Sequence, residues 1–99
     1  MEFSIGYNSD FRLTQSLIEE IIRKNKLAIQ NPAPIVRMSS HGQSSINIDV
    51  KVWTKTDNYA ELRYDLTEQV KEVFDENNIS VIYNLLNVNV ISGKENTEE

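Results

Sequence analysis

The sequence predicts an α+β fold, a ferredoxin-like β-α-β-β-α-β sandwich with an antiparallel or mixed sheet, two helices on one face and a short C-terminal strand. Two observations predict it. Two long stretches repeat apolar residues at helical spacing, and shorter stretches alternate apolar with polar residues, as half-buried strands do. The 99 residues suffice for one small domain.

The first two expected elements are a strand and a helix. Phe3, Ile5 and Tyr7 alternate with polar or small residues, which is typical of a strand with one buried face. Residues 8–10 supply N-cap side chains, and we expect a helix over about residues 11–25. The predicted buried face of this helix is Leu13, Leu17, Ile18, Ile21 and Ile22.

A hairpin is expected next. Pro32 and Pro34 exclude a helix, and residues 35–39 then form a predicted second strand. Residues 40–43 form the predicted turn, in which Gly42 is free to take a positive φ. In the third strand Ile46, Ile48, Val50 and Val52 alternate with Asn47, Asp49, Lys51 and Trp53. The apolar set is expected to face the helices, against Leu17, Ile21, Leu62, Leu66 and Val70.

A second helix is expected over about residues 58–76, capped by the side chains of Thr56, Asp57 or Asn58. Its predicted apolar stripe is Tyr59, Leu62, Leu66, Val70, Val73 and Phe74. Asn77 and Asn78 suit the left-handed turn that ends a helix. Residues 79–84 predict a fourth strand, residues 87–91 alternate again, and residues 92–99 form an acidic tail that we expect to be disordered.

Composition excludes several classes of function. A net charge of −5 is unsuited to binding nucleic-acid phosphates or an anionic membrane surface. The absence of cysteine excludes a disulfide framework, a thiolate nucleophile and a cysteine metal site. No apolar run approaches the roughly 18 residues that cross a bilayer, so the chain taken alone is expected to be soluble.

The polar residues predict no catalytic, cofactor-binding or metal-binding site, and hence no enzyme. His41 stands in a turn without a carboxylate fixed by local spacing, which favours a solvated histidine over a general base. Ser44 and Ser45 lie in nothing that resembles a nucleophile elbow. The second helix carries the carboxylates Glu61, Asp65, Glu68, Glu72, Asp75 and Glu76. Without a glycine-bearing calcium loop, they indicate a solvated helix face rather than a cation site.

Trp53 falls on the polar face of its strand and invites two interpretations. It could stack a ligand, but aromatic residues favour interfaces, so we expect it to pack at the end of the sheet against a neighbouring segment or subunit. An RNA-binding sheet is disfavoured because the third strand presents Asn47, Asp49 and Lys51 where base-stacking aromatics would be needed. These residues indicate a binding, interaction or structural domain.

Several short motifs follow one another along the chain. They are Phe3-x-Ile5-Gly6-Tyr7-x-x-Asp10, Pro32-x-Pro34, Ser44-Ser45-Ile46-Asn47, Val50-x-Val52-Trp53-x-Lys55, Asp57-x-Tyr59, Asp65-Leu66-x-Glu68-x-Val70-Lys71, Phe74-Asp75-Glu76-x-x-Ile79 and Asn87-Val88-Asn89-Val90. In order and spacing, from about residue 2 to residue 90, they resemble the C-terminal cytoplasmic α/β domain of small-conductance mechanosensitive channels, the MscS family. Two departures stand out. The proline-aromatic-proline-glutamine segment usual in the family reads Ile82-Tyr83-Asn84-Leu85, and the usual glycine after the second helix is Asn78.

The resemblance implies a piece of a longer membrane protein that lacks its pore. Such channels are homoheptamers of the inner membrane that open under tension and release ions and small osmolytes on hypo-osmotic shock. Residues 1–86 would form the cytoplasmic α/β domain, part of a hollow vestibule, and residues 87–91 an oligomerisation strand in a barrel shared between subunits. The membrane would be reached only through upstream transmembrane helices. By itself the chain is expected to be a monomer or weak dimer.

One alternative function stays open on the sequence. A free-standing ferredoxin-like module that binds a small ligand at a dimer interface would have the same order of elements. Modules of that kind pair through sheet edges or faces. The apolar and polar pattern alone therefore does not distinguish such a module from a channel domain.

Overall fold

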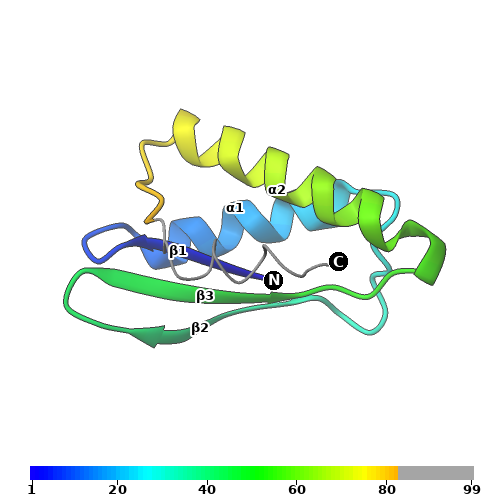
Figure 1. Ribbon diagram of the computed structural model, residues 1–99, viewed down its shortest axis with the longest axis horizontal. Coiled ribbons are helices and arrows are strands. Elements are labelled where there is room, and N and C mark those ends of the chain that lie inside the picture. The colour runs from blue at the N-terminus through cyan, green and yellow to red at the C-terminus, as the bar shows by residue number, and fades with distance from the viewer. Residues whose placement is uncertain (83–99) are drawn as a thin grey trace, which may run out of the picture.

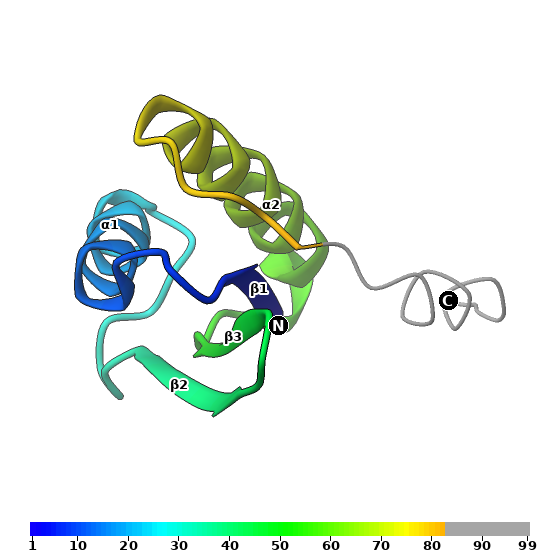
Figure 2. The same ribbon diagram turned by 90° about the vertical axis from the view of Figure 1, so that its left-hand side faces the viewer.

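The computed structural model describes residues 1–82, in which two helices cover one face of an antiparallel sheet (Figure 1). The elements are β1 (Glu2–Gly6), α1 (Phe11–Lys24), β2 (Ile35–His41), β3 (Ser45–Lys51), a 3₁₀ turn (Thr56–Asn58) and α2 (Tyr59–Glu76). Seen along the strands, α1 and α2 lie side by side on the same side of the sheet (Figure 2). The predicted α+β class is therefore confirmed.

The three strands lie in the order β1-β3-β2. Phe3 pairs with Ile48 and Ile5 with Ile46, while on the other side of β3 Val36 pairs with Val50. A bulge between Met38 and Ser40 shifts the β2 register. Of the predicted fourth strand, the described residues contain one antiparallel bridge, between Val81 and Ile5. The remainder of that strand, the predicted strand 87–91 and the tail 92–99 lie outside the described residues.

The buried core lies between the sheet and the helices, as the apolar periodicities predict. Ile46, Ile48 and Val50 of β3 are buried, and Val52 is half-buried past the end of the strand. The helices contribute Ile18, Ile22, Leu62, Leu66, Val70 and Phe74. The Phe74 ring packs edge-on against Phe3, with centroids 6.2 Å apart. The predicted register of β3 is therefore correct.

Two residues predicted in the helix stripes are exposed. Leu13 is 41% exposed, and Thr14 is fully buried in its place, because 14, 18 and 22 follow one another at four-residue steps down the same face of α1. The Thr14 hydroxyl donates to the carbonyl of Asp10 over 2.8 Å, so its burial leaves no polar atom without a partner. Tyr59 is 63% exposed because it borders an open groove beside β1 rather than the covered core.

The helix ends confirm one predicted cap and correct another. Asp10 caps α1, with its carboxylate accepting from the backbone N–H of Leu13 over 3.0 Å. The chain enters α2 through the 3₁₀ turn instead, and Asn58 makes no side-chain capping bond. Asn78 has a φ of 58°, the left-handed conformation predicted after α2.

The hairpin between β2 and β3 differs from the predicted turn. β2 continues to His41, and the N–H of Gly42 donates to the carbonyl of Ser45 over 2.9 Å. Gly42 does not have a positive φ. The reason is the length of the connection: three residues, 42–44, separate the strands, so the tight two-residue turn that demands positive φ is not formed.

Candidate functional site

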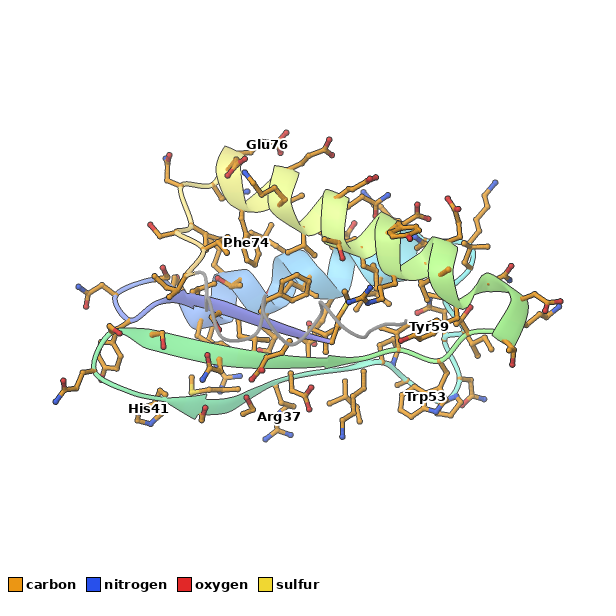
Figure 3. All side chains as sticks on the ribbon, in the orientation of Figure 1. Arg37, His41, Trp53, Tyr59, Phe74 and Glu76 are labelled. Carbon is orange, nitrogen blue, oxygen red and sulfur yellow. The ribbon has the colours of Figure 1, made fainter. Side chains whose placement is uncertain are left out.

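The open face of the sheet, which is the side away from α1 and α2, is the candidate functional surface. Arg37 and Trp53 point to this side, with Trp53 at the end of the sheet away from the hairpin (Figure 3). Because successive side chains of a strand alternate between faces, the polar positions of β3 and their partners on β1 and β2 fall here. The surface consists of short rows of residues that cross the strands.

The row nearest the hairpin is a hydrogen-bonded chain of small polar groups. Ser4 donates to the amide oxygen of Asn47 over 2.6 Å, and the Asn47 amide nitrogen donates to Ser40 over 2.8 Å. Ser39 also donates to the Asn47 carbonyl, over 3.2 Å. These side chains satisfy one another across all three strands, so this part of the face is polar and ordered.

The next row carries charges. Asp49 pairs in register with Glu2 on β1 and with Arg37 on β2. The carboxylates of Asp49 and Glu2 are therefore neighbours, and the Arg37 cation lies on the other side of Asp49. The Lys51 ammonium lies 3.9 Å from the Asp49 carboxylate, along the same strand. Two carboxylates directly opposite one another repel, and the neighbouring cations of Arg37 and Lys51 offset that repulsion.

The far end of the open face is apolar. Ile29, in the connection between α1 and β2, forms an antiparallel bridge with Trp53 and donates to its carbonyl over 2.7 Å. Ile35 pairs with Lys51, two residues before Trp53, and therefore shares its face. Ile29, Ile35 and Trp53 are 37%, 39% and 39% exposed, and we refer to them as the apolar end. A partly exposed group of this kind, rimmed by polar residues, is typical of a contact surface.

The backbone of Trp53 thus pairs with a neighbouring segment at the end of the sheet, and a side-chain hydrogen bond holds that segment in place. The hydroxyl of Thr54 donates to the carbonyl of Leu27 over 2.7 Å. The sequence does not reveal Ile29 and Ile35 as neighbours of Trp53, because the pairing depends on the path of an irregular connection. The two-residue alternation on β2 and β3 would have placed Ile35 once the register was known.

The polar residues weighed as chemical candidates are dispersed. His41 is exposed at the end of β2, with its ring centroid 6.3 Å from that of Tyr7. The carboxylates of α2 lie along the helix, where Asp65 accepts from Asn25 over 3.2 Å and Asp75 pairs with Lys71 over 2.6 Å. Across residues 1–82, no three histidine or acidic side chains come together in a group that could hold a metal ion.

Comparison with known proteins assigns the family. The model of the C-terminal part of the mechanosensitive ion channel MscS matches residues 1–81. This chain belongs to the MscS family. An uncharacterised MscS family protein of Synechocystis is 33% identical over 87 residues, which is 88% of this chain and 29% of that protein. A small-conductance mechanosensitive channel of Helicobacter pylori is 29% identical over 85 residues, covering 85% of this chain and 31% of the channel.

A solved structure matches the fold of this MscS domain. The closed-state crystal structure of Helicobacter pylori MscS superposes with a TM-score of 0.75 at 28% identity, covering 85% of this chain and 34% of that one. The chain therefore spans about a third of the length of the MscS proteins that it matches. Neither α1 nor α2, the helices of the described part, combines the length and hydropathy of a membrane-spanning helix.

Proposed function

We propose that this chain forms part of the cytoplasmic vestibule of a mechanosensitive ion channel, which releases ions and small osmolytes when the cell meets hypo-osmotic shock. The observation that carries the proposal is the match of residues 1–81 to the C-terminal part of MscS. The matched channel is about three times as long as this chain. The pore and the transmembrane helices belong to the remainder of such a protein. The domain acts on the inner face of the cell membrane, and its role is structural rather than enzymatic.

The apolar end of the open face is the surface through which we expect the domain to contact the rest of the channel. The Met1 ammonium donates to the Val50 carbonyl over 2.8 Å, so a chain that continued β1 backwards would run beside Val52 and Trp53. Ile29, Ile35 and Trp53 lie at that same end of the sheet. Upstream residues or a neighbouring subunit would cover apolar surface there.

Other copies of the chain are the proposed partners, in the homoheptamer typical of the family. The strand at residues 87–91 would pair with its counterparts in neighbouring subunits, and residues 1–86 would form the vestibule wall. The alternative of a free-standing module that binds a small ligand gains no support, since the relatives match this chain over a third of a longer protein.

A domain exchange tests the proposal. Residues 1–99 replace the matching third of the Helicobacter pylori channel, and the chimera is expressed in a bacterium that lacks its own mechanosensitive channels. We expect tension-gated currents in membrane patches and improved survival of a hypo-osmotic shock. A chimera that reaches the membrane at normal levels and yet gives neither currents nor protection would contradict the proposal.

Two substitutions in the chimera test the apolar end. Trp53→Asp places a charge among Ile29 and Ile35, and we expect fewer assembled channels on native gels. Glu61→Gln, on the exposed side of α2, is the matched control and should leave assembly unchanged. Equal assembly of the two variants would show that the apolar end makes no contact in the channel.

A further inference from the structure

β2 is an edge strand, and the register of the sheet shows which of its backbone groups face outward. β3 separates β2 from β1. Val50 of β3 exchanges two hydrogen bonds of 2.8 Å with Met1, so the backbone of Val50 faces β1. Val36 lies opposite Val50, and its N–H and C=O groups therefore face away from β3. Because strand residues alternate, the backbone of Met38 faces the same outer side. An outer edge of this kind is a template for another strand.

A glutamine side chain from α1 already occupies one of these outward groups. The Gln15 amide nitrogen donates to the Val36 carbonyl over 2.7 Å. The Arg12 guanidinium donates to the Gln15 amide oxygen over 3.1 Å. Because a guanidinium can only donate, this contact leaves the amide nitrogen, and not the oxygen, for Val36. The Gln15 side chain is half-buried in this position. A strand that docked here would have to break its bond to Val36.

The positions on either side of Val36 are also unsuited to a strand ladder. Pro34, two residues earlier, has no N–H to donate. On the other side, a bulge between Met38 and Ser40 ends the regular register. The regular outer edge is therefore short, and the Val36 carbonyl lies near its centre. Prolines, bulges and covering elements are the means by which natural sheets prevent pairing between their edges.

We propose that Gln15 closes the outer edge of β2 to strand addition by another copy of this chain. With the Val36 carbonyl occupied, an incoming strand loses a hydrogen bond near the centre of a short ladder. The excluded partner is a second copy, because a twofold axis would set the same β2 edge of two copies antiparallel to one another. Contacts between copies of this chain would then have to use other surfaces.

Gln15→Met tests the role of the amide in the purified 99-residue chain. Methionine keeps the length and helix propensity of glutamine but has no N–H donor. Two copies would each regain a carbonyl for pairing, so we expect the dissociation constant for self-association, measured by sedimentation, to fall by about tenfold or more. Gln69→Met makes the same change at an exposed position of α2 and should leave self-association unchanged. Equal association of the two variants, or no increase in Gln15→Met, would overturn the proposal.

A second substitution locates the contact between the copies. Met38→Pro deletes an N–H on the outer side of β2, which the ladder to β3 does not use, and edge strands tolerate such a proline. Combined with Gln15→Met, it should restore the sedimentation of the unaltered chain, because an added strand needs that N–H. Self-association that persists in the double variant would place the contact elsewhere and overturn the proposal.

Hydrogen exchange and a lysine variant give independent readouts. In Gln15→Met, exchange of the Met38 amide should slow as the protein concentration rises, and exchange that does not depend on concentration would contradict the proposal. Gln15→Lys keeps a donor for the Val36 carbonyl and adds a charge, so it should associate no more than the unaltered chain. If circular dichroism shows that Gln15→Met does not fold, Gln15→Ala and Gln69→Ala provide the same comparison.

The sedimentation test concerns only the outer edge of β2 and does not depend on the proposed channel function. Its failure therefore leaves that function standing, while a failure of the chimera leaves the role of Gln15 untouched.

Discussion

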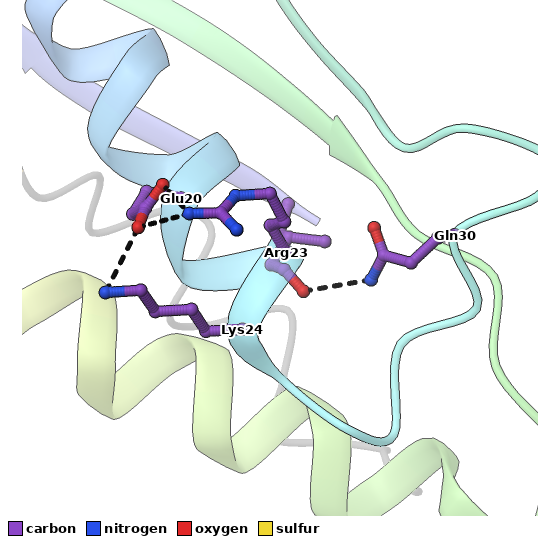
Figure 4. Close-up of polar contacts among 5 residues, drawn as sticks. Glu20, Arg23, Lys24 and Gln30 are labelled. Carbon is purple, nitrogen blue, oxygen red and sulfur yellow. Dashed lines mark hydrogen bonds and ion pairs between the residues drawn. The ribbon is translucent and has the colours of Figure 1, made fainter.

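At the scale of single residues, Glu20 on α1 forms ion pairs with two cationic side chains in the last turn of the helix. Its carboxylate accepts two hydrogen bonds from Arg23, one of 2.6 Å, and lies 3.1 Å from the Lys24 ammonium (Figure 4). The bond to Arg23, and then that to Lys24, lower the pKa of Glu20 from 4.5 to about 2, and the same contact raises the pKa of Arg23. The Gln30 amide donates to the Ile22 carbonyl nearby, which satisfies one of the free carbonyls at the end of α1.

The Glu20 cluster predicts a specific pH dependence. Because the folded-state pKa is lowered, the stabilisation is complete above about pH 4.5 and is lost as the pH falls towards 2. Carboxyl NMR should give a titration midpoint for Glu20 of about 2. In the double variant Arg23→Gln, Lys24→Gln the midpoint should return towards 4.5. A midpoint near 4.5 in the unaltered chain would contradict the ion cluster.

Thr14 and Thr67 make the same hydrogen bond but differ in burial, so comparing them isolates the effect of burial on stability. Each hydroxyl donates to the carbonyl four residues earlier over 2.8 Å, but Thr14 is fully buried and Thr67 is exposed. We expect Thr14→Val to reduce the free energy of unfolding by about 1 kcal/mol, because the hydroxyl bond is lost inside the core. Thr67→Val should change it by less than about 0.5 kcal/mol. Urea denaturation of both variants checks this, and equal losses would show that burial is not the deciding factor.

At the scale of elements, the end of α2 is the most specific local structure. The N–H of Ile79 donates to the Phe74 carbonyl over 2.9 Å and that of Asn78 to Asp75 over 3.4 Å. With Asn78 at a φ of 58°, this is a Schellman motif, and it turns the chain back towards β1. Ser80 and Ile82 can then bond to the β1 edge.

Substitutions at Asn78 and Gly42 distinguish a residue that needs positive φ from one that does not. Asn78→Gly should raise the free energy of unfolding by up to about 1 kcal/mol, and Asn78→Ala should lower it by about 1 kcal/mol. Gly42 lacks a positive φ, and an added Cβ would meet nothing within 4 Å. Gly42→Ala should therefore be neutral or stabilising by about 0.4–1 kcal/mol. Thermal denaturation that shows a large loss for Gly42→Ala would contradict this distinction.

The helices and strands could be predicted from the sequence, but details that depend on tertiary packing could not. Period-two alternation predicted β3 and its buried face because a strand covered on one side has a single solution. The choice of Thr14 over Leu13 could not be predicted, since both suit a helix and the rotation of α1 is set by its packing on the sheet. The contact of Ile29 with Trp53 depends on the irregular connection between α1 and β2, which no local periodicity describes. The sequence predicted Trp53 as a contact residue, but not the residues that complete the apolar end.

At the scale of the whole molecule, the resemblance to MscS is confirmed by the family match and by the shared fold. The division into a domain, an oligomerisation strand and a tail stays a prediction, because residues 83–99 lie outside the described part. The fold class follows from local patterns within residues 1–82, whereas the predicted oligomerisation strand lies outside them.

We expect the isolated chain to sediment as a monomer or weak dimer at micromolar concentration. The strand predicted at residues 87–91 would form only a few hydrogen bonds with other subunits, each worth a net of roughly 0.5–1.5 kcal/mol. That sum does not offset the entropy lost when several subunits assemble. Analytical ultracentrifugation over a range of concentrations measures this. A stable heptamer would show that the domain assembles without the membrane part.

The two backbone hydrogen bonds between Met1 and Val50 give the domain a preferred direction of mechanical resistance. A pull on Met1 along the axis of β1 strains every bond between β1 and β3 at once, because the whole ladder must slide. A pull across the sheet breaks the same bonds one after another, at a lower force. Force that enters this domain along the strand is thus shared by the hydrogen bonds that join β1 to β3.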